Sequence, residues 1–162
     1  AASPGTRVIA TDRSHAALKI AALNAARYQL NKIHFVQTDL LLGLDSPLDL
    51  ICANLPYIPT EVLNGLPLAQ WEPRLALDGG PDGLDLIRRL LKQARTRLAP
   101  GGRMLLEIEA TTGKAALAAA REAFSNAQIE LHPDLAGKAR LIEIRKTQPP
   151  TELIKNHHMT IE

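Results

Sequence analysis

The chain has 162 residues, a net charge of +2 and a hydrophobic content of 46%, which together predict one domain with a substantial apolar core. No stretch is long and apolar enough to predict a membrane span, and the balanced charge gives no electrostatic support for binding to nucleic acid. The single cysteine, Cys52, excludes a disulfide framework and favours a reducing, cytoplasmic compartment.

Residues 7–12 and 33–38 are short apolar segments that predict two strands. Between them, the alanine-rich stretch 15–28 has its apolar residues on one broad face, which predicts a helix. Ser14 is a suitable N-cap for that helix because its hydroxyl can accept a hydrogen bond from an unpaired backbone N–H. The chain therefore begins with the order strand, helix, strand.

The apolar run 48–53 predicts a third strand, and it leads directly into Asn54-Leu55-Pro56-Tyr57. Prolines and glycines recur through 56–83, so we expect a loop without regular structure there. Loops of that length in compact domains are usually functional or mobile. A helical period follows over 84–98, with leucines directed inward and arginines outward.

The last third of the chain predicts three more strands and one more helix. Pro100-Gly101-Gly102 is expected to end the preceding helix. A strand over 104–108 and a helix over 113–124 follow, and the segments 128–131 and 141–145 predict the last two strands.

The alternation of strands and helices predicts an α/β fold with a mostly parallel sheet and helices on both faces. The last two strands are expected to be antiparallel because a turn at 134–137, not a helix, joins them. We expect the domain to span 1–146. The polar segment 147–162 shows no hydrophobic period and is expected to be a frayed tail.

Three consecutive predicted strands end in Asp12, Asp39 and Asn54. In a parallel sheet all three side chains face the crevice at the carboxyl edge, where such folds bind ligands. A carboxylate at such a strand end can accept from two ribose hydroxyls, and a second carboxylate can accept from an exocyclic amine. Taken singly, Asp12 is better explained as a turn or cap residue beside Ser14, and Asp39 as a turn residue. Taken together with Asn54, they favour a ligand-binding role.

The tetrapeptide Asn54-Leu55-Pro56-Tyr57 offers groups that can grip a flat NH2-bearing substrate. The Asn54 side-chain oxygen and the Leu55 carbonyl can each accept one N–H, which favours turning the nitrogen lone pair towards a methyl donor. Pro56 holds Leu55 extended and so fixes where that carbonyl points. Tyr57 can stack on the flat group. The alternative is a proline-rich turn without catalytic function.

With these motifs the chain resembles the class I S-adenosylmethionine-dependent methyltransferases, and more narrowly the HemK/PrmC family, the N5-glutamine methyltransferases of peptide chain release factors. The resemblance extends over 7–146, and its most specific part is the block 72–84. The other segments that carry it are 57–59, 98–102 and 134–140.

The resemblance implies a Rossmann-like sheet, S-adenosylmethionine as the methyl donor and a release-factor glutamine as the acceptor. It implies that Asp12 binds the cofactor ribose, that Asp39 lies by the adenine, and that Asn54 also contacts the cofactor. It gives no metal site.

For the substrate, the resemblance implies that Asn54 and Leu55, with Pro56, hold the glutamine amide and that Tyr57 packs against it; Asn54 and Tyr57 are the catalytic candidates. Glu72 is assigned to the substrate loop, with an exposed loop carboxylate as the alternative. Leu55 stands where the family usually has proline, and its carbonyl serves with less rigidity.

The family's first strand and glycine-rich loop find no counterpart in the chain and are expected to precede Ala1. In the family order that strand lies between the strands 7–12 and 48–53, at the sheet centre. We therefore expect two exposed strand edges, which favour self-association. The hypothesis is that this chain alone does not bind the cofactor normally or turn over.

Two other interpretations remain open. Asn-Leu-Pro-Tyr also resembles the motif of ribosomal RNA adenine dimethyltransferases, in which an adenine N6 of RNA or DNA would occupy the pocket. The chain could also be a non-catalytic fragment. Cys52 is expected to be a core thiol because it lies inside an apolar strand, and no histidine spacing predicts a metal site.

Overall fold

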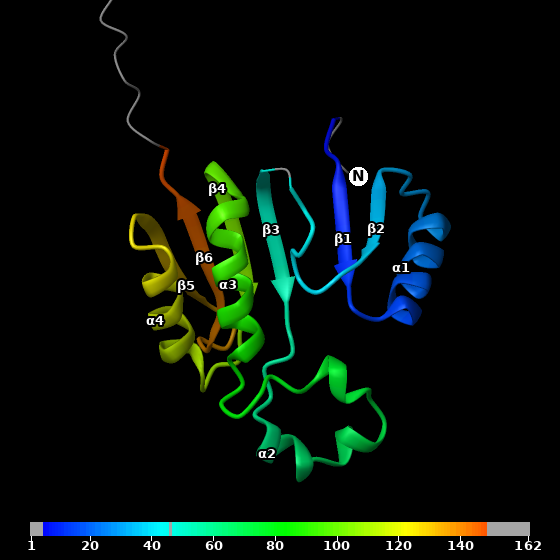
Figure 1. Cartoon of the computed structure of the whole chain (residues 1–162). Coiled ribbons are helices and arrows are strands. Elements are labelled where there is room, and N and C mark those ends of the chain that lie inside the picture. The colour runs from blue at the N-terminus through cyan, green and yellow to red at the C-terminus, as the bar shows by residue number, and fades with distance from the viewer. Residues whose placement is uncertain (1–4, 46, 149–162) are drawn as a thin grey trace, which may run out of the picture.

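The computed structural model describes residues 5–45 and 47–148, and within them it forms an α/β fold with two sheets. A parallel two-stranded sheet has the order β1-β2, and a four-stranded sheet has the order β3-β4-β6-β5 (Figure 1). The strands are β1 (Val8–Asp12), β2 (Ile33–Gln37), β3 (Leu48–Asn54), β4 (Leu98–Glu107), β5 (Ala127–Pro133) and β6 (Ala139–Lys146).

Only β6 runs against the other strands of its sheet. β3 and β4 are parallel, while β6 pairs antiparallel with both β4 and β5. The predicted mostly parallel sheet with an antiparallel last strand is therefore confirmed. In the turn that joins β5 to β6, Asp134 Oδ1 accepts from the backbone N–H groups of Ala136 and Lys138, at 2.9 and 3.0 Å.

The core lies between the four-stranded sheet and two helices, α3 (Asp85–Arg97) and α4 (Gly113–Ala123). The apolar residues of α3 that recur at helical spacing are buried, as the sequence predicts, and its arginines and lysine at 88, 89, 92 and 95 are exposed. Burying one such leucine or isoleucine stabilises the fold by about 1.5–3 kcal/mol. The buried residues of α3 are Ile87, Leu90, Leu91 and Ala94.

Helix α1 (His15–Arg27) begins where the sequence predicts. The Ser14 hydroxyl accepts a hydrogen bond from the backbone N–H of Ala17 at 3.2 Å, which confirms the predicted N-cap. Leu18 and Ala25 are buried in the helix, whereas the apolar Ile20 and Leu23 are exposed. The broad apolar face of α1 is thus only partly covered within the described residues.

The predicted start of the strand after α3 is wrong. β4 begins at Leu98 directly after α3 and continues through Pro100-Gly101-Gly102, which we expected to lie outside any strand. The strand absorbs these residues as a bulge: Leu48 pairs with Leu98, but Leu50 already pairs with Arg103. Gly101 permits this irregularity because its φ of 76° is accessible mainly to glycine.

The stretch 56–83 also contains more regular structure than predicted. It forms a short helix, α2, and two 3-10 turns, which together make a small lobe below the strands in Figure 1. Local hydrogen bonds within single turns hold these elements, and a hydrophobic period cannot reveal pieces this short. The three are α2 (Thr60–Asn64), η1 (Pro67–Gln70) and η2 (Arg74–Ala76).

Cys52 is exposed, so the expectation of a core thiol is wrong. Side chains alternate between the faces of a strand. In β3, Ile51 is buried and Ala53 packs on the core beneath the helices, so Cys52 lies on the opposite face. Within the described residues, that face lacks the helical cover that we expected on both sides of the sheet.

β1 and β3 do not pair with each other, because β1 pairs only with β2 and β3 only with β4 in the described part of the chain. The expectation that another strand separates them in the family order stays a prediction. The expected tail spans 147–162, of which only 147 and 148 belong to the described residues. The boundary at 146 therefore stays a prediction. No helix in the described ranges is long and apolar enough to cross a membrane.

Candidate functional site

The ends of β1, β2 and β3 lie at the same edge of the molecule. The three arrows in Figure 1 point the same way, towards the lobe that contains α2. Asp12 ends β1, Asp39 follows β2, and Asn54 ends β3. The shared edge that the sequence predicts for these three side chains is therefore present, and the lobe stands next to it.

All four residues of the tetrapeptide line one hollow of about 350 Å³. Asn54 is exposed at its rim, and its side chain makes no hydrogen bond to another described residue. The remaining walls are apolar side chains of the lobe, and Tyr57 is the one ionisable residue in the lining. Those lobe residues are Ile58, Leu68, Ala76 and Leu77.

Backbone hydrogen bonds fasten the segment after the tetrapeptide to the far side of the lobe. The N–H of Ile58 donates to the Leu77 carbonyl at 3.0 Å, and the N–H of Gly79 donates to the Ile58 carbonyl at 2.9 Å. One step further, the N–H of Thr60 donates to Gly80 at 3.0 Å. Ile58 and Asp78 form an isolated parallel bridge. The bridge holds Ile58 and Leu77, which line the hollow, beside each other.

The Asp78 carboxylate reinforces this bridge from both sides. Its Oδ1 accepts from the Thr60 hydroxyl at 2.6 Å and from the Gly80 N–H at 3.0 Å, and its Oδ2 pairs with Arg74 at 2.8 Å. The hydrogen bond from Thr60, with those from Gly80 and Arg74, holds the pKa of Asp78 below its usual range. We call the bridge, with Asp78 and the turn 79–83, the loop clamp.

Two glycines of the loop clamp pack directly on the backbone of Tyr57. A Cβ on Gly79 would lie 2.8 Å from the Tyr57 Cα, and one on Gly83 would lie 2.3 Å from the Tyr57 carbonyl oxygen. Gly83 also has a φ of 78°, which favours glycine. The sequence predicts turn residues here, but it does not predict this close packing, because the contact joins positions 22 to 26 residues apart.

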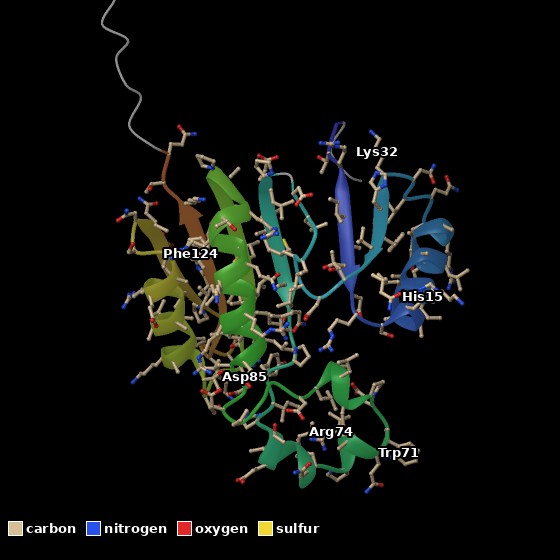
Figure 2. The ribbon with its side chains drawn as sticks, viewed as in Figure 1. His15, Lys32, Trp71, Arg74, Asp85 and Phe124 are labelled. Atoms are coloured by element: carbon tan, nitrogen blue, oxygen red, sulfur yellow. The ribbon has the colours of Figure 1, made fainter. Side chains whose placement is uncertain are left out.

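A second hollow, of about 500 Å³, lies on the other side of η2. It joins Arg13, directly after β1, to the loop clamp and to the first turns of α3. Arg74 and Asp85, both labelled in Figure 2, belong to its lining, and Trp71 projects from the outer rim of the lobe. Acidic and basic side chains are therefore mixed in this hollow, unlike in the apolar hollow of the tetrapeptide.

The two candidate cofactor carboxylates already have partners. Asp12 Oδ1 accepts from the backbone N–H of Ser14 at 2.6 Å, which is the turn interaction that the sequence left as an alternative. Asp39 Oδ2 accepts from the Arg89 guanidinium of α3, and its Oδ1 is buried without a partner in the described part of the chain. Asp12 Oδ2 has no hydrogen bond to another described residue.

Glu72 does not join the site. It is exposed, it lines neither hollow, and its side chain makes no hydrogen bond within the described residues. Its backbone N–H donates to the Leu68 carbonyl at 3.1 Å, which helps to close η1. Its assignment to the substrate loop stays a prediction.

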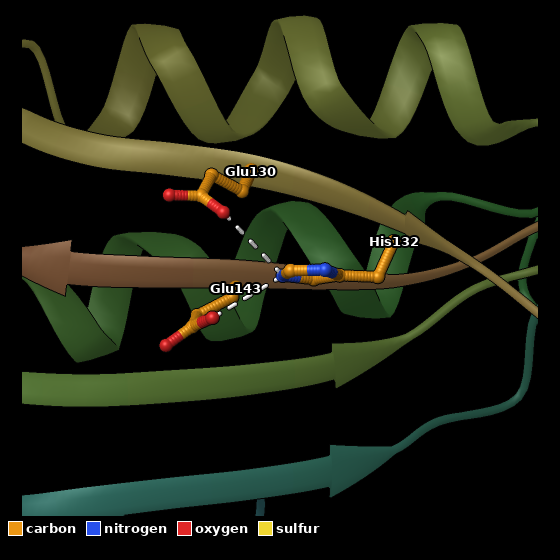
Figure 3. A group of neighbouring side chains, drawn as sticks. All are labelled: Glu130, His132 and Glu143. Carbon is orange, nitrogen blue, oxygen red and sulfur yellow. Dashed lines mark hydrogen bonds and ion pairs between the residues drawn. The ribbon is translucent and has the colours of Figure 1, made fainter.

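One cluster that the sequence did not predict lies on the β5–β6 pair, where Glu130, His132 and Glu143 have side-chain ligand atoms within 4.8 Å of one another (Figure 3). Glu143 is nearly buried, and Arg145 donates to both of its oxygens, at 2.7 and 3.1 Å. Those bonds hold the pKa of Glu143 below its usual range. Arg103 Nη1 also lies 3.6 Å from Glu143 Oε1. The cluster is therefore an ion-pair network in which basic side chains compensate the acidic ones.

Solved structures with similar folds define the class of protein. A methyltransferase from Pyrococcus furiosus matches with a TM-score of 0.63 at 16% identity, covering 87% of this chain and 63% of that one. A Streptococcus mutans protein solved in complex with SAH matches with a TM-score of 0.56 at 15% identity, covering 86% and 76%. The fold is that of the class I methyltransferases.

Sequence relatives narrow the class. The release factor glutamine methyltransferase of Moorella thermoacetica is 49% identical over 142 residues, which are 85% of this chain and 50% of the relative. That of Deinococcus radiodurans is 41% identical over 147 residues, 90% and 52%. The chain is thus homologous to the release factor glutamine methyltransferases and spans about half their length. No protein-family model matches it.

Proposed function

We propose that this chain contributes to the transfer of a methyl group from S-adenosylmethionine to the side-chain amide nitrogen of a glutamine in a peptide chain release factor. The observation that carries the proposal is Asn54-Leu55-Pro56-Tyr57 at the end of β3, lining one hollow that the loop clamp holds in place. The names of the relatives support glutamine as the acceptor over adenine.

The hollow suits an amide because it offers acceptors and an aromatic ring. The Asn54 side-chain oxygen, free of other hydrogen bonds in the described residues, can accept one amide proton, and the Leu55 carbonyl can accept the other. Tyr57 can stack on the planar amide. Because the lining holds no carboxylate or histidine, positioning and electrostatics supply the acceleration.

The donor side of the proposal rests on the strand ends of β1 and β2. Ser14 occupies only Oδ1 of Asp12, so Oδ2 can accept from the ribose hydroxyls. Asp39, which follows the neighbouring strand β2, can accept from the exocyclic amine of the adenine. These acceptors fit the polar groups of S-adenosylmethionine, which when bound supplies an electrophilic methyl group on a sulfonium. The SAH in the Streptococcus mutans structure is the product of such a transfer.

Activity is expected to need more than these 162 residues. The site's two halves belong to separate sheets, since Asp12 and Asp39 follow one sheet and Asn54 the other. No glycine-rich loop after a strand is present in the sequence to bind the methionine part of the cofactor. We expect the isolated chain to bind S-adenosylmethionine more weakly than micromolar and to be inactive.

The test uses two proteins: the 162-residue chain, and the same chain joined to the segment of the Moorella thermoacetica relative that it does not match, called the joined protein. Tritiated methyl transfer is measured with release factor and with RNA as acceptors. We expect activity of the joined protein on release factor only, and a loss of about 100-fold or more with Asn54→Ala.

The control variant is Glu61→Ala, which changes an exposed carboxylate of α2 that lines neither hollow. This variant is expected to retain activity. If the joined protein methylated RNA and not release factor, the acceptor would be adenine and the proposed glutamine specificity would be wrong. Activity indifferent to Asn54→Ala would exclude the amide grip, and micromolar cofactor affinity of the isolated chain would contradict its expected impairment.

We also propose that the isolated chain self-associates through the unpaired edges of β1 and β3, and that a release factor as substrate places the reaction in the cytoplasm. Unpaired strand edges present free backbone donors and acceptors that a second copy can satisfy.

A further inference from the structure

Arg89 connects two elements that are far apart in the sequence. It lies on the outward side of α3, and its Nη2 donates to Oδ2 of Asp39 in the turn after β2, across 50 residues of chain. Arg89 also lines the hollow of about 500 Å³ together with Arg13, which directly follows β1. The guanidinium thus stands beside the ends of the two strands proposed to hold the cofactor.

The Asp39 carboxylate is held in an unusual orientation. Its Oδ1 is buried and has no hydrogen-bond partner among the described residues, although the side chain as a whole is 30% exposed. A buried carboxylate oxygen without a partner is costly, so another interaction must oppose rotation of that oxygen towards water. Arg89 supplies it, because its charge and hydrogen bond engage the opposite oxygen.

A carboxylate oxygen can accept more than one hydrogen bond, so Oδ2 of Asp39 can accept from a ligand while Arg89 holds it. We propose that Arg89 is a positioning residue that aims Asp39 at the exocyclic amine of adenine in S-adenosylmethionine. This inference rests on the function proposed above. It makes the pair a determinant of specificity, since a 6-oxo purine would present a carbonyl to the carboxylate and be rejected.

The pair itself is tested in the full 162-residue chain by guanidinium NMR. A paired arginine shows slowed rotation and exchange of its Nη protons, so one slowed signal should vanish in Arg89→Met and lose its slowing in Asp39→Asn. Arg95→Met removes an exposed charge from the same helix and should leave that signal unchanged. If Asp39→Asn leaves the Arg89 signal slowed, the pair does not form and the proposal fails.

Specificity is tested in the joined protein by titration with S-adenosylhomocysteine and with S-inosylhomocysteine, which carries a 6-oxo purine. We expect Arg89→Met to weaken binding of the adenine compound by about tenfold or more, to change binding of the inosine compound little, and so to narrow the preference between them. Arg89→Lys should restore part of the preference, and Arg95→Met should leave it unchanged.

The outcomes separate this inference from the function beneath it. A joined protein that binds neither compound overturns the proposed cofactor and this role of Arg89 with it. If the adenine compound binds but Arg89→Met weakens both compounds equally, Arg89 has only a structural role. Tighter binding of the adenine compound in Arg89→Met would show that Arg89 competes with the ligand for Asp39, which also overturns the proposal.

Discussion

At the scale of single residues, the tetrapeptide depends on neighbours that carry no chemistry of their own. In the proposed function Asn54 supplies the acceptor and Tyr57 the ring. Gly79 and Gly83 pack against the Tyr57 backbone so closely that no side chain fits between them, and they therefore determine where that backbone lies. The position of the tetrapeptide therefore depends on the two glycines that pack against it.

Gly83→Ala tests this dependence. Its Cβ would meet the Tyr57 carbonyl oxygen at 2.3 Å in a backbone with a φ of 78°. We expect a loss of more than about 3 kcal/mol in the free energy of unfolding, measured by urea denaturation of the chain, and loss of methyl transfer in the joined protein.

Gly43→Ala is the matched control, because Gly43 has a φ of 75° but a Cβ there would meet nothing within 4 Å. It should cost only the strain of the left-handed backbone, about 1–2 kcal/mol. Equal losses of unfolding free energy in the two variants would show that the contact with Tyr57 is unimportant.

At the scale of elements, the loop clamp holds the lobe in place as one wall of the candidate site. Its bridge ties the chain after β3 to the chain before α3, and α3 in turn packs its apolar side chains into the main core. The lobe is therefore anchored at both of its ends, and Asp78 is the side chain that bonds most widely within it.

The clamp is expected to weaken in acid. Because the pKa of Asp78 is lowered below the ordinary value of 3.8 for an aspartate, the ionised carboxylate stabilises the fold above about pH 3.8. That contribution is lost as the pH falls through the lower pKa of the folded state. In urea unfolding of the chain, Asp78→Asn should be less stable than the wild type at pH 7, and the difference should shrink below pH 3.8.

Asp45→Asn serves as the control, since the Asp45 side chain forms no ion pair or hydrogen bond with another described residue. Its difference from the wild type should change little over the same range of pH. A wild-type advantage over Asp78→Asn that persists undiminished below the folded-state pKa would contradict the assigned role of the carboxylate.

At the scale of the whole molecule, the most consequential feature is the division of the strands into two separate sheets. β1 and β3 each leave one edge unpaired in the described residues, and Leu50 of β3 is 55% exposed. Exposed strand edges beside apolar side chains favour pairing with another copy. The same division places Asn54 on one sheet and Asp12 and Asp39 on the side of the other. The proposed association and the proposed impairment of cofactor binding would therefore share one structural cause.

Leu50→Lys tests the association, because a charge on an edge strand opposes pairing between copies. Sedimentation velocity of the wild-type chain should show species larger than a monomer that increase with concentration, and Leu50→Lys should reduce them. Leu23→Lys, on the exposed face of α1, should behave as the wild type. A wild-type chain that stays monomeric at all concentrations would exclude association through these edges.

The strands, the three long helices and the common edge of Asp12, Asp39 and Asn54 could be predicted from the sequence. Hydrophobic periods, the Ser14 cap and strand–helix alternation are local signals, and parallel strands necessarily bring their carboxyl ends to one edge. The proposed chemistry of the tetrapeptide could be predicted for the same reason, since its four groups are adjacent in the chain.

Only the tertiary structure decided which side chains support that chemistry. The bridge to Asp78, the packing of Gly83 on Tyr57 and the pairing of Arg89 with Asp39 all join positions far apart in the chain. The exposure of Cys52 likewise depends on which face of β3 the helices cover. A sequence pattern reports neighbours along the chain, whereas these contacts exist only once the chain has folded.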